Sequence, residues 1–389
     1  MISPPAVGRE RHRKPLRPLL PILALAWLQW ATPSWGKSAD LAPVSAQVWD
    51  EDDGLPGGWV RDFAQTKDGR LWVATDSGVG QLVGERFDTV AAQSGFERIA
   101  SVVALAVDGR GRLWMGPLAG EPVCLNANEL SDCLPEGHRI ARPIRFVDME
   151  SGPEGSVWFA AEDLVYVFSQ GSLSWVSSVP ATIGIVRAIN VDHQGNLWIG
   201  GTGGLFVRSR QGEIVRHAIA ARVGPPEIRA LARGRGNTIL VAGASFLLRV
   251  GPLGDEVLGE GEAFRGVDVR SVIEDKAGRV WLSGSAGLFR VKAYGELGKV
   301  ALDGEAQMRN RNTTELFEDD NGYIWIGTES AGVIRILPPV NPPQKTGPWL
   351  SVLSVLIGFF LLATLALVFR RFRAQRGRGA APGDVEAPR

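Results

Sequence analysis

Five arginines occupy one position of a repeated sequence pattern. Each follows a valine or isoleucine that opens a short apolar segment; they are Arg61, Arg145, Arg187, Arg229 and Arg270. A guanidinium group binds carboxylates and other anions through paired hydrogen bonds. If these segments lie around a common axis, the arginines would ring one opening and attract an anionic ligand such as an acidic saccharide. The alternative is that each arginine pairs with an acid on a neighbouring segment and serves only the structure.

The chain has two cysteines, Cys124 and Cys133. They lie on what is predicted to be one outer hairpin, and an exported protein meets an oxidising environment. We therefore expect them to form a structural disulfide. Two cysteines without a nearby pair of histidines do not make a metal site.

The remaining polar residues give no sign of a catalytic or metal centre. The four histidines are scattered along the chain. The acidic runs at 51–53 and 318–322 lack the alternating oxygen ligands and the final glutamate of a calcium loop. The sequence contains no nucleophile elbow, phosphate-binding loop or kinase signature. We expect no metal, no cofactor and no enzymatic activity.

The arginine-containing segments belong to a longer repeat. Its clearest copy, Asp192–Gly200, has an Asp-x-x-Gly turn followed by a short apolar strand centred on a tryptophan. Ile239 stands where one copy lacks this tryptophan; the six that are present are Trp72, Trp114, Trp158, Trp198, Trp281 and Trp325. A period of about 40–45 residues with four short strands is typical of propeller blades. We predict an all-β fold, a single seven-bladed β-propeller over residues 44–337, with these tryptophans in its core.

The two ends of the repeat region are expected to complete one blade together. The seventh copy ends at Ile336 without a fourth strand, whereas residues 44–49 form a predicted strand that has no blade of its own. We expect this N-terminal strand to close the ring, since closure removes the exposed edges of an open sheet.

Both chain termini carry membrane-related features. Basic residues and an apolar run predict a signal peptide over 1–36, with retention as an anchor as the alternative. After a Pro-rich linker at 338–348, residues 349–369 carry no charge and are long enough for one transmembrane helix. The arginine-rich tail, 370–389, is expected to be disordered and cytoplasmic. The propeller would then lie in the periplasm, held by a single-pass anchor in the inner membrane.

Charge is distributed unevenly along the chain. The formal net charge is zero, but residues 37–348 contain 39 acidic and 31 basic residues. Nucleic-acid binding needs a basic face on the folded part. An acidic body between basic ends therefore argues against a nucleic-acid partner.

The repeats resemble those of the two-component regulator propeller family. The resemblance rests on Asp53-Gly54-Leu55-Pro56, then Val-Arg-x-Ile/Phe, the Asp-x-x-Gly turn with its tryptophan, and Gly-Leu-x-Arg; the best copies span 186–208, 269–290 and 313–335. In that family the repeats form the exported sensor part of membrane-bound histidine kinases and diguanylate cyclases. The resemblance implies a periplasmic ligand- or partner-sensing propeller.

Relatives carry an output domain after the membrane helix, and the tail at 370–389 is too short for one to be expected here. We therefore expect either a truncated or split sensor or a protein that pairs with a membrane signalling partner. Two other functions stay open. One is a membrane-tethered scaffold for protein–protein interaction in the cell envelope; the other is a periplasmic glycan-active enzyme. The sequence does not identify the ligand.

Overall fold

The computed structural model describes residues 44–337 except 91–96, 137–139, 141–143, 162–163, 176–179, 220–226, 293–294 and 310. The predicted signal peptide, Pro-rich linker, transmembrane helix and tail lie outside the described residues. Within the described part, no helix has the length and apolar character of a membrane span.

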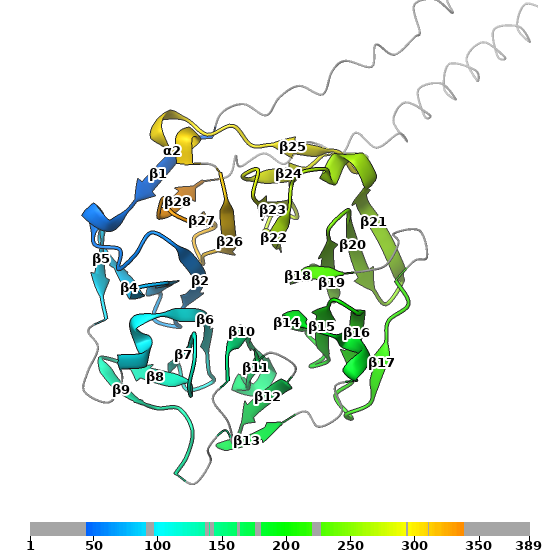
Figure 1. Ribbon diagram of the computed structural model, residues 1–389, viewed down its shortest axis with the longest axis horizontal. Helices are drawn as coiled ribbons and strands as arrows, with labels where there is room; N and C mark the ends of the chain where they lie inside the picture. The colour runs from blue at the N-terminus through cyan, green and yellow to red at the C-terminus, as the bar shows by residue number, and fades with distance from the viewer. Residues whose placement is uncertain are drawn as a thin grey trace, which may run out of the picture.

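The described strands form seven four-stranded antiparallel sheets around a central axis (Figure 1). Blades 1 to 3 comprise β2 (Val60–Gln65), β3 (Leu71–Thr75), β4 (Gly78–Val83) and β5 (Arg86–Thr89); β6 (Val102–Val107), β7 (Leu113–Pro117), β8 (Val123–Asn126) and β9 (Glu129–Asp132); and β10 (Phe146–Ser151), β11 (Val157–Ala161), β12 (Leu164–Ser169) and β13 (Ser172–Trp175). Blades 4 and 5 comprise β14 (Val186–Val191), β15 (Leu197–Gly201), β16 (Gly204–Arg208) and β17 (Ile214–Arg216), and β18 (Ile228–Gly234), β19 (Thr238–Gly243), β20 (Phe246–Gly251) and β21 (Gly254–Glu260). Blades 6 and 7 comprise β22 (Val269–Glu274), β23 (Val280–Gly284), β24 (Phe289–Val291) and β25 (Leu297–Lys299), and β26 (Thr313–Glu318), β27 (Ile324–Thr328), β28 (Val333–Ile336) and β1 (Ala46–Trp49).

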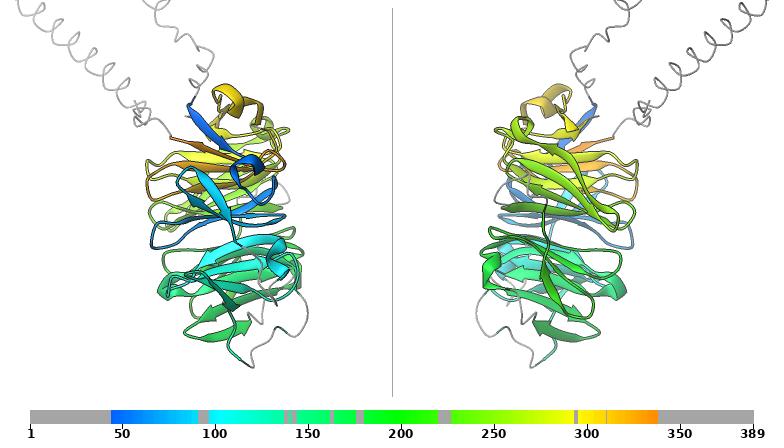
Figure 2. Two further views of the ribbon diagram at one scale, coloured as in Figure 1. Left: turned by 90° about the vertical axis from the view of Figure 1, so that its left-hand side faces the viewer. Right: turned by 90° about the vertical axis from the view of Figure 1, so that its right-hand side faces the viewer.

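The prediction of a seven-bladed all-β propeller is confirmed. Short helices lie on the connections: η1 (Glu51–Asp53), η2 (Glu97–Ala100), η3 (Pro153–Gly155), η4 (Ala181–Ile183), η6 (Gly261–Phe264) and α2 (Gly304–Arg309). Side views show a disc in which the blades follow one another around the ring (Figure 2).

The N-terminal strand closes the ring as predicted. β1 pairs antiparallel with β28, in a register that runs from Ala46 opposite Ile336 to Trp49 opposite Val333. Just before β1, Val44 forms a parallel bridge with Leu302, which follows blade 6. Because strands from the two ends of the chain share one sheet, blade 7 obtains its outer strand from the start of the sequence.

Apolar side chains of adjacent blades pack against each other and form the core. One cluster joins Trp72 and Ala74 of blade 1 to Leu105 and Met115 of blade 2. Both faces of the second strands are covered in this way, as in the fully buried β3 and β7, so these strands lack strict alternation of apolar and polar residues.

The turn aspartate explains the spacing of the tryptophan repeat. The indole Nε1–H of Trp281 donates to the buried Asp275 carboxylate at 2.8 Å, and that carboxylate also accepts the backbone N–H of Arg279 at 2.8 Å. The same indole–carboxylate bond joins Trp114 to Asp108 (3.1 Å), Trp198 to Asp192 (3.1 Å) and Trp325 to Asp319 (2.8 Å). Trp72 and Trp158 instead donate to the hydroxyls of Thr66 (3.1 Å) and Ser156 (3.2 Å). Trp198 is partly exposed, and the other five are buried.

Blade 5 differs from the sequence-based alignment by one residue. Ala232 pairs with Leu240, at the register position where Ile273 pairs with Trp281 in blade 6. Leu240 therefore occupies the tryptophan position, and the assignment of Ile239 was wrong. The cause is Asn237, which adopts the left-handed turn conformation (φ 60°) that Gly195 provides in blade 4. Because asparagine tolerates this conformation, the sequence pattern placed Gly236 at the turn-glycine position, one residue too early.

The two cysteines lie in blade 2. Cys124 is in β8, Cys133 directly follows β9, and the two form a disulfide with their Cα atoms 4.9 Å apart. Both are buried against the cluster that contains Trp114.

Candidate functional site

A central cavity of about 600 Å³ is the main candidate site. Its wall contains residues of all seven inner strands, β2, β6, β10, β14, β18, β22 and β26. A volume of this size lies in the usual range of small-molecule pockets.

An irregularity in each inner strand shapes the cavity wall. In every blade the register with the second strand shifts after the first pair, for example between Val60 and Asp62. A bulge of this kind takes a residue out of the ladder and re-aims the side chains beside it. It also leaves backbone N–H groups that require other acceptors.

Side chains of one blade supply these acceptors to the next. The Asp62 carboxylate accepts the backbone N–H of Leu105 in blade 2 at 2.6 Å and of its own neighbour Phe63 at 2.7 Å. Asp148 of blade 3 accepts the N–H of Ile189 in blade 4 at 2.8 Å. These two aspartates therefore tie the inner strands of adjacent blades together.

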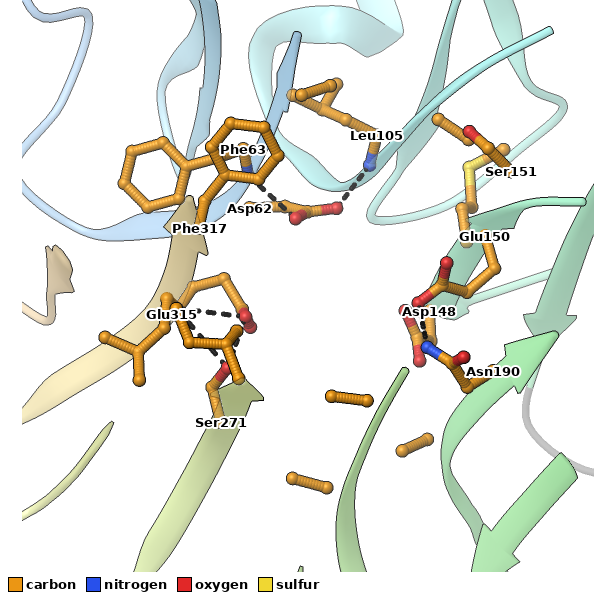
Figure 3. Close-up of a pocket in the computed structure, with 18 of the residues that line it drawn as sticks. Asp62, Phe63, Leu105, Asp148, Glu150, Ser151, Asn190, Ser271, Glu315 and Phe317 are labelled. Atoms are coloured by element: carbon orange, nitrogen blue, oxygen red, sulfur yellow. Dashed lines mark hydrogen bonds between the residues drawn. The ribbon is translucent and has the colours of Figure 1, made fainter. Parts of the chain in front are cut away.

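Six acidic residues line the cavity: Asp62, Asp148, Glu150, Glu315, Glu318 and Asp320. Figure 3 shows Asp148 and Glu150 on one side of the opening and Glu315 on the other. Glu150 Oε1 accepts a hydrogen bond from Asn190 Nδ2 at 2.8 Å, and Glu315 accepts one from the Ser271 hydroxyl.

Burial inside the ring changes the ionisation of these acids. It raises the pKa of Glu150 to about 7, against the opposing effects of Arg233 and Asn190. It also raises the pKa of Glu315 to about 7, and the charge of Glu150 adds to this increase. Burial, reinforced by neighbouring carboxylates, raises the pKa values of Asp62 and Asp148 well above the usual range. The side chains are partly exposed where they line the cavity, so water there moderates these shifts.

Four of the five predicted arginines line the same cavity. Arg61, Arg187, Arg229 and Arg270 each occupy the second position of an inner strand. The expectation for Arg145 is wrong: β10 begins at Phe146, so Val147 holds the equivalent position and Arg145 is an exposed residue before the strand. Ile144-Arg145 matches the Val-Arg pattern in sequence, but it lies two residues before Phe146-Val147, which occupies the Val-Arg position in the strand.

Three of these arginines form ion pairs with acids of the next blade. The pairs are Arg187 with Glu227 (3.6 Å), Arg229 with Asp268, and Arg270 with Glu329 (3.5 Å). These pairs are expected if the arginines serve only the structure. They also compensate much of the positive charge at the mouth of the cavity. Partly exposed pairs of this type contribute about 0–1 kcal/mol each to stability.

Arg61 is held differently from the other three. Its guanidinium lies over the Trp59 ring, 3.4 Å from the centroid, and its buried Nε has no hydrogen-bond partner. Burial lowers the pKa of Arg61, opposed by the charges of Asp76 and Glu329.

The cavity acids and Asn190 were missed in the sequence. The available signal was an acid interrupting an otherwise apolar inner strand, as at Asp62 and Asp148. Position alone does not show that the two residues face a common space, because that depends on the bulge in each strand.

The described histidines lie away from the cavity. His193 is in the blade 4 turn, and His217 Nε2 lies 3.3 Å from Asp255 on the outer side of blades 4 and 5. Within the described residues, no group of three or more histidine, cysteine or acidic side chains is arranged to hold a metal ion.

Solved structures similar to this chain are propellers. The extracellular domain of a hybrid two-component system from B. thetaiotaomicron is 19% identical with a TM-score of 0.63, and the match covers 77% of this chain and 42% of that one. A second such domain from the same organism is 14% identical with a TM-score of 0.63, over 77% and 40% of the two chains. Virginiamycin B lyase from Staphylococcus aureus is 10% identical with a TM-score of 0.62, over 76% and 99%.

Identities this low establish the fold alone, and the chain spans less than half the length of the two solved extracellular domains. No curated protein sequence matches it significantly. The family model described as two component regulator propeller matches residues 54–77, in blade 1, and 307–330, mainly in blade 7. The resemblance inferred from the repeats is therefore confirmed, and the chain carries two-component regulator propeller repeats.

Proposed function

We propose that this protein is the sensor part of a two-component-type signalling system, with its propeller in the periplasm and residues 349–369 as its inner-membrane anchor. The observation that carries the proposal is the match of blades 1 and 7 to two-component regulator propeller repeats. The likeness to extracellular domains of two-component systems supports the same function.

Blade 7 is suited to link the cavity to the membrane. Glu315 and Phe317 of β26 line the cavity, and β28 of the same sheet leads into residues 338–348 and the proposed anchor. A ligand that shifts β26 would therefore act on the sheet directly attached to the anchor. The output would come from a membrane signalling partner that responds to this movement.

The proposed entry point for ligand is the mouth lined by the arginines. An acidic group, such as the carboxylate of a saccharide, would compete with Glu227 and Glu329 for Arg187 and Arg270. The test is a thermal-shift screen against periplasmic metabolites and acidic oligosaccharides, followed by titration of any ligand found. Replacing both Arg187 and Arg270 with alanine is expected to weaken its binding by at least about tenfold, the equivalent of about 1.4 kcal/mol.

The matched control is Arg210→Ala, which removes an exposed arginine paired with Glu154 on the opposite face of the blades. Its affinity for the ligand should equal that of the unmodified protein. Unchanged affinity in the Arg187→Ala/Arg270→Ala variant would assign the arginines to structure alone.

Location is tested separately from binding. In spheroplasts, an externally added protease should cut the propeller, while an epitope fused to the C-terminus stays protected until the membrane is permeabilised. Degradation of the epitope in intact spheroplasts would contradict the proposed orientation.

An exported enzyme is the second candidate, because carboxyl groups with raised pKa values in a cavity can act as acids or bases. One structure of the virginiamycin B lyase is described as a catalytically inactive histidine-to-alanine variant. Of the described histidines, neither His193 nor His217 lines the cavity, and Glu150 or Glu315 would serve as the acid or base instead. Turnover of a glycan by the purified chain, lost in Glu150→Gln, would favour this candidate.

A further inference from the structure

Asn190, in the cavity wall, has a side-chain oxygen without a hydrogen-bond partner. The residue is only 4% exposed, and its Nδ2 donates to Glu150 while its Oδ1 has no hydrogen-bond partner. A buried acceptor that lacks a donor costs about 1–3 kcal/mol. This oxygen has almost no accessible surface of its own, but the Asn190 side chain lines the cavity, so a small rotation of the amide would bring the oxygen to an external donor.

The groups around Asn190 are acceptors rather than donors. Asp148 and Glu150 project from β10 beside it, and Glu315 projects from β26 across the cavity (Figure 3). Arg233 on β18 is the basic group that acts on Glu150, but its guanidinium donates to the backbone carbonyls of Val191 (2.6 Å) and Ser151. In the described contacts no cation is bonded directly to these carboxyl groups.

We propose that this part of the cavity binds the ammonium group of a small organic cation, held by Glu150 and Asp148 and by Asn190 Oδ1. An ammonium group offers three donors and no acceptor, which matches two carboxylates and one amide oxygen. A metal ion fits less well, since the described acids do not form a three-ligand cluster.

The adjoining sector of the wall suits the carbon chain of such a cation. Ala188 of blade 4 and Ala230 and Ala232 of blade 5 line the cavity there, and their small apolar side chains leave room beside the acids. Pockets for small molecules combine this type of apolar lining with a few convergent polar groups. The site rests on the proposed sensor function for its purpose, but binding itself can be measured without any signal output.

Ionisation of the acids should make binding depend on pH. The groups that face Glu150 are Asp148 on its own strand, Asn190 on β14, Arg233 on β18 and Glu315 on β26. A bound cation favours the charged carboxylates, so binding releases protons and strengthens as the pH rises through about 7.

The experiment is calorimetric titration of the full chain in detergent with three four-carbon probes that differ in charge. 1,4-Diaminobutane is expected to bind and 1,4-butanediol is not, and succinate should not compete with the diamine for its site. Affinity for the diamine should fall by at least about tenfold in Glu150→Gln and again when the pH is lowered to about 5. Asn190→Leu, which keeps the volume but removes the acceptor, should also weaken binding.

Glu213→Gln is the control, because it neutralises an exposed carboxylate on the outer side of blade 4. It should bind the diamine like the unmodified chain. Absence of diamine binding, equal binding of the three probes, or unchanged affinity in a folded Glu150→Gln variant would overturn the proposal. Diamine binding without any effect on signalling would support the proposed binding site but contradict the sensor function.

Discussion

Replacing Trp49 with alanine is expected to lower the free energy of unfolding by about 3–5 kcal/mol, as for other large-to-small changes of buried aromatic residues. The side chain is 4% exposed and packs against Trp325, with ring centroids 5.4 Å apart, and against Phe87 at 6.4 Å. Its Nε1–H donates to the Glu85 carbonyl at 2.8 Å. Trp49 thus joins the closing strand of blade 7 to blade 1, so its loss weakens the seam where the two ends of the ring meet.

Urea unfolding followed by tryptophan fluorescence would measure this loss. Gln47→Ala, in the same strand but with an exposed side chain, should change stability by less than about 0.5 kcal/mol. Limited proteolysis should cut Trp49→Ala first between residues 44 and 60, where the closing strand detaches. A loss below about 1 kcal/mol, or first cleavage elsewhere, would show that the seam does not limit stability.

The propeller is expected to be more stable at about pH 5 than at about pH 8, unlike most proteins whose acids are stabilised in the charged form. Glu150 and Glu315 have folded pKa values of about 7, above their ordinary value of 4.5. Between these values the folded protein keeps protons that the unfolded chain has released. Stability from these groups is therefore complete below pH 4.5 and is lost as the pH rises through 7.

The expected size of this effect is about 3 kcal/mol for one glutamate, reduced by water in the cavity. Asp62 and Asp148 act in the same direction, since their pKa values are also raised. Glu150→Gln and Glu315→Gln imitate the protonated side chains. They should flatten the pH dependence and make the protein more stable than the unmodified chain at about pH 8.

Urea unfolding at several pH values between about 5 and 8 would test this expectation. In that range, groups with lowered pKa values, such as Asp50 and Asp108, stay charged and contribute little change. Glu213→Gln should retain the slope of the unmodified protein. If the unfolding free energy depended equally on pH in Glu150→Gln, Glu315→Gln and Glu213→Gln, the two cavity glutamates would not cause the pH dependence.

Most of the ring could be predicted from the sequence because the repeat encodes it locally. The Asp-x-x-Gly-x-x-Trp spacing reflects a hydrogen bond that forms within a single hairpin, for example from the Trp281 indole to the Asp275 carboxylate. Ring closure could also be predicted, since residues 44–49 and the incomplete last blade each lacked a partner. Blade 5 was misread only where Asn237 replaced the expected turn glycine.

The site was harder to predict because it depends on contacts between blades. The arginines were found by their repeated position, but their acids, Glu227, Asp268 and Glu329, come from connections whose length differs from blade to blade. The pairing of Asp62 with Leu105 crosses from one blade to the next and has no local sequence pattern. Arg145 shows the same limit, since only the strand register separates it from Val147.

The pairing of β1 with β28 has a consequence for biogenesis. Of the described strands β1 is synthesised first, and its partner β28 lies nearly 290 residues later, so the ring cannot be completed until Ile336 has been synthesised. Contacts this distant in sequence slow folding, because the intervening chain must be ordered first. Until then the last blade has an unpaired edge, which makes the nearly finished chain the form most exposed to aggregation and to binding by chaperones.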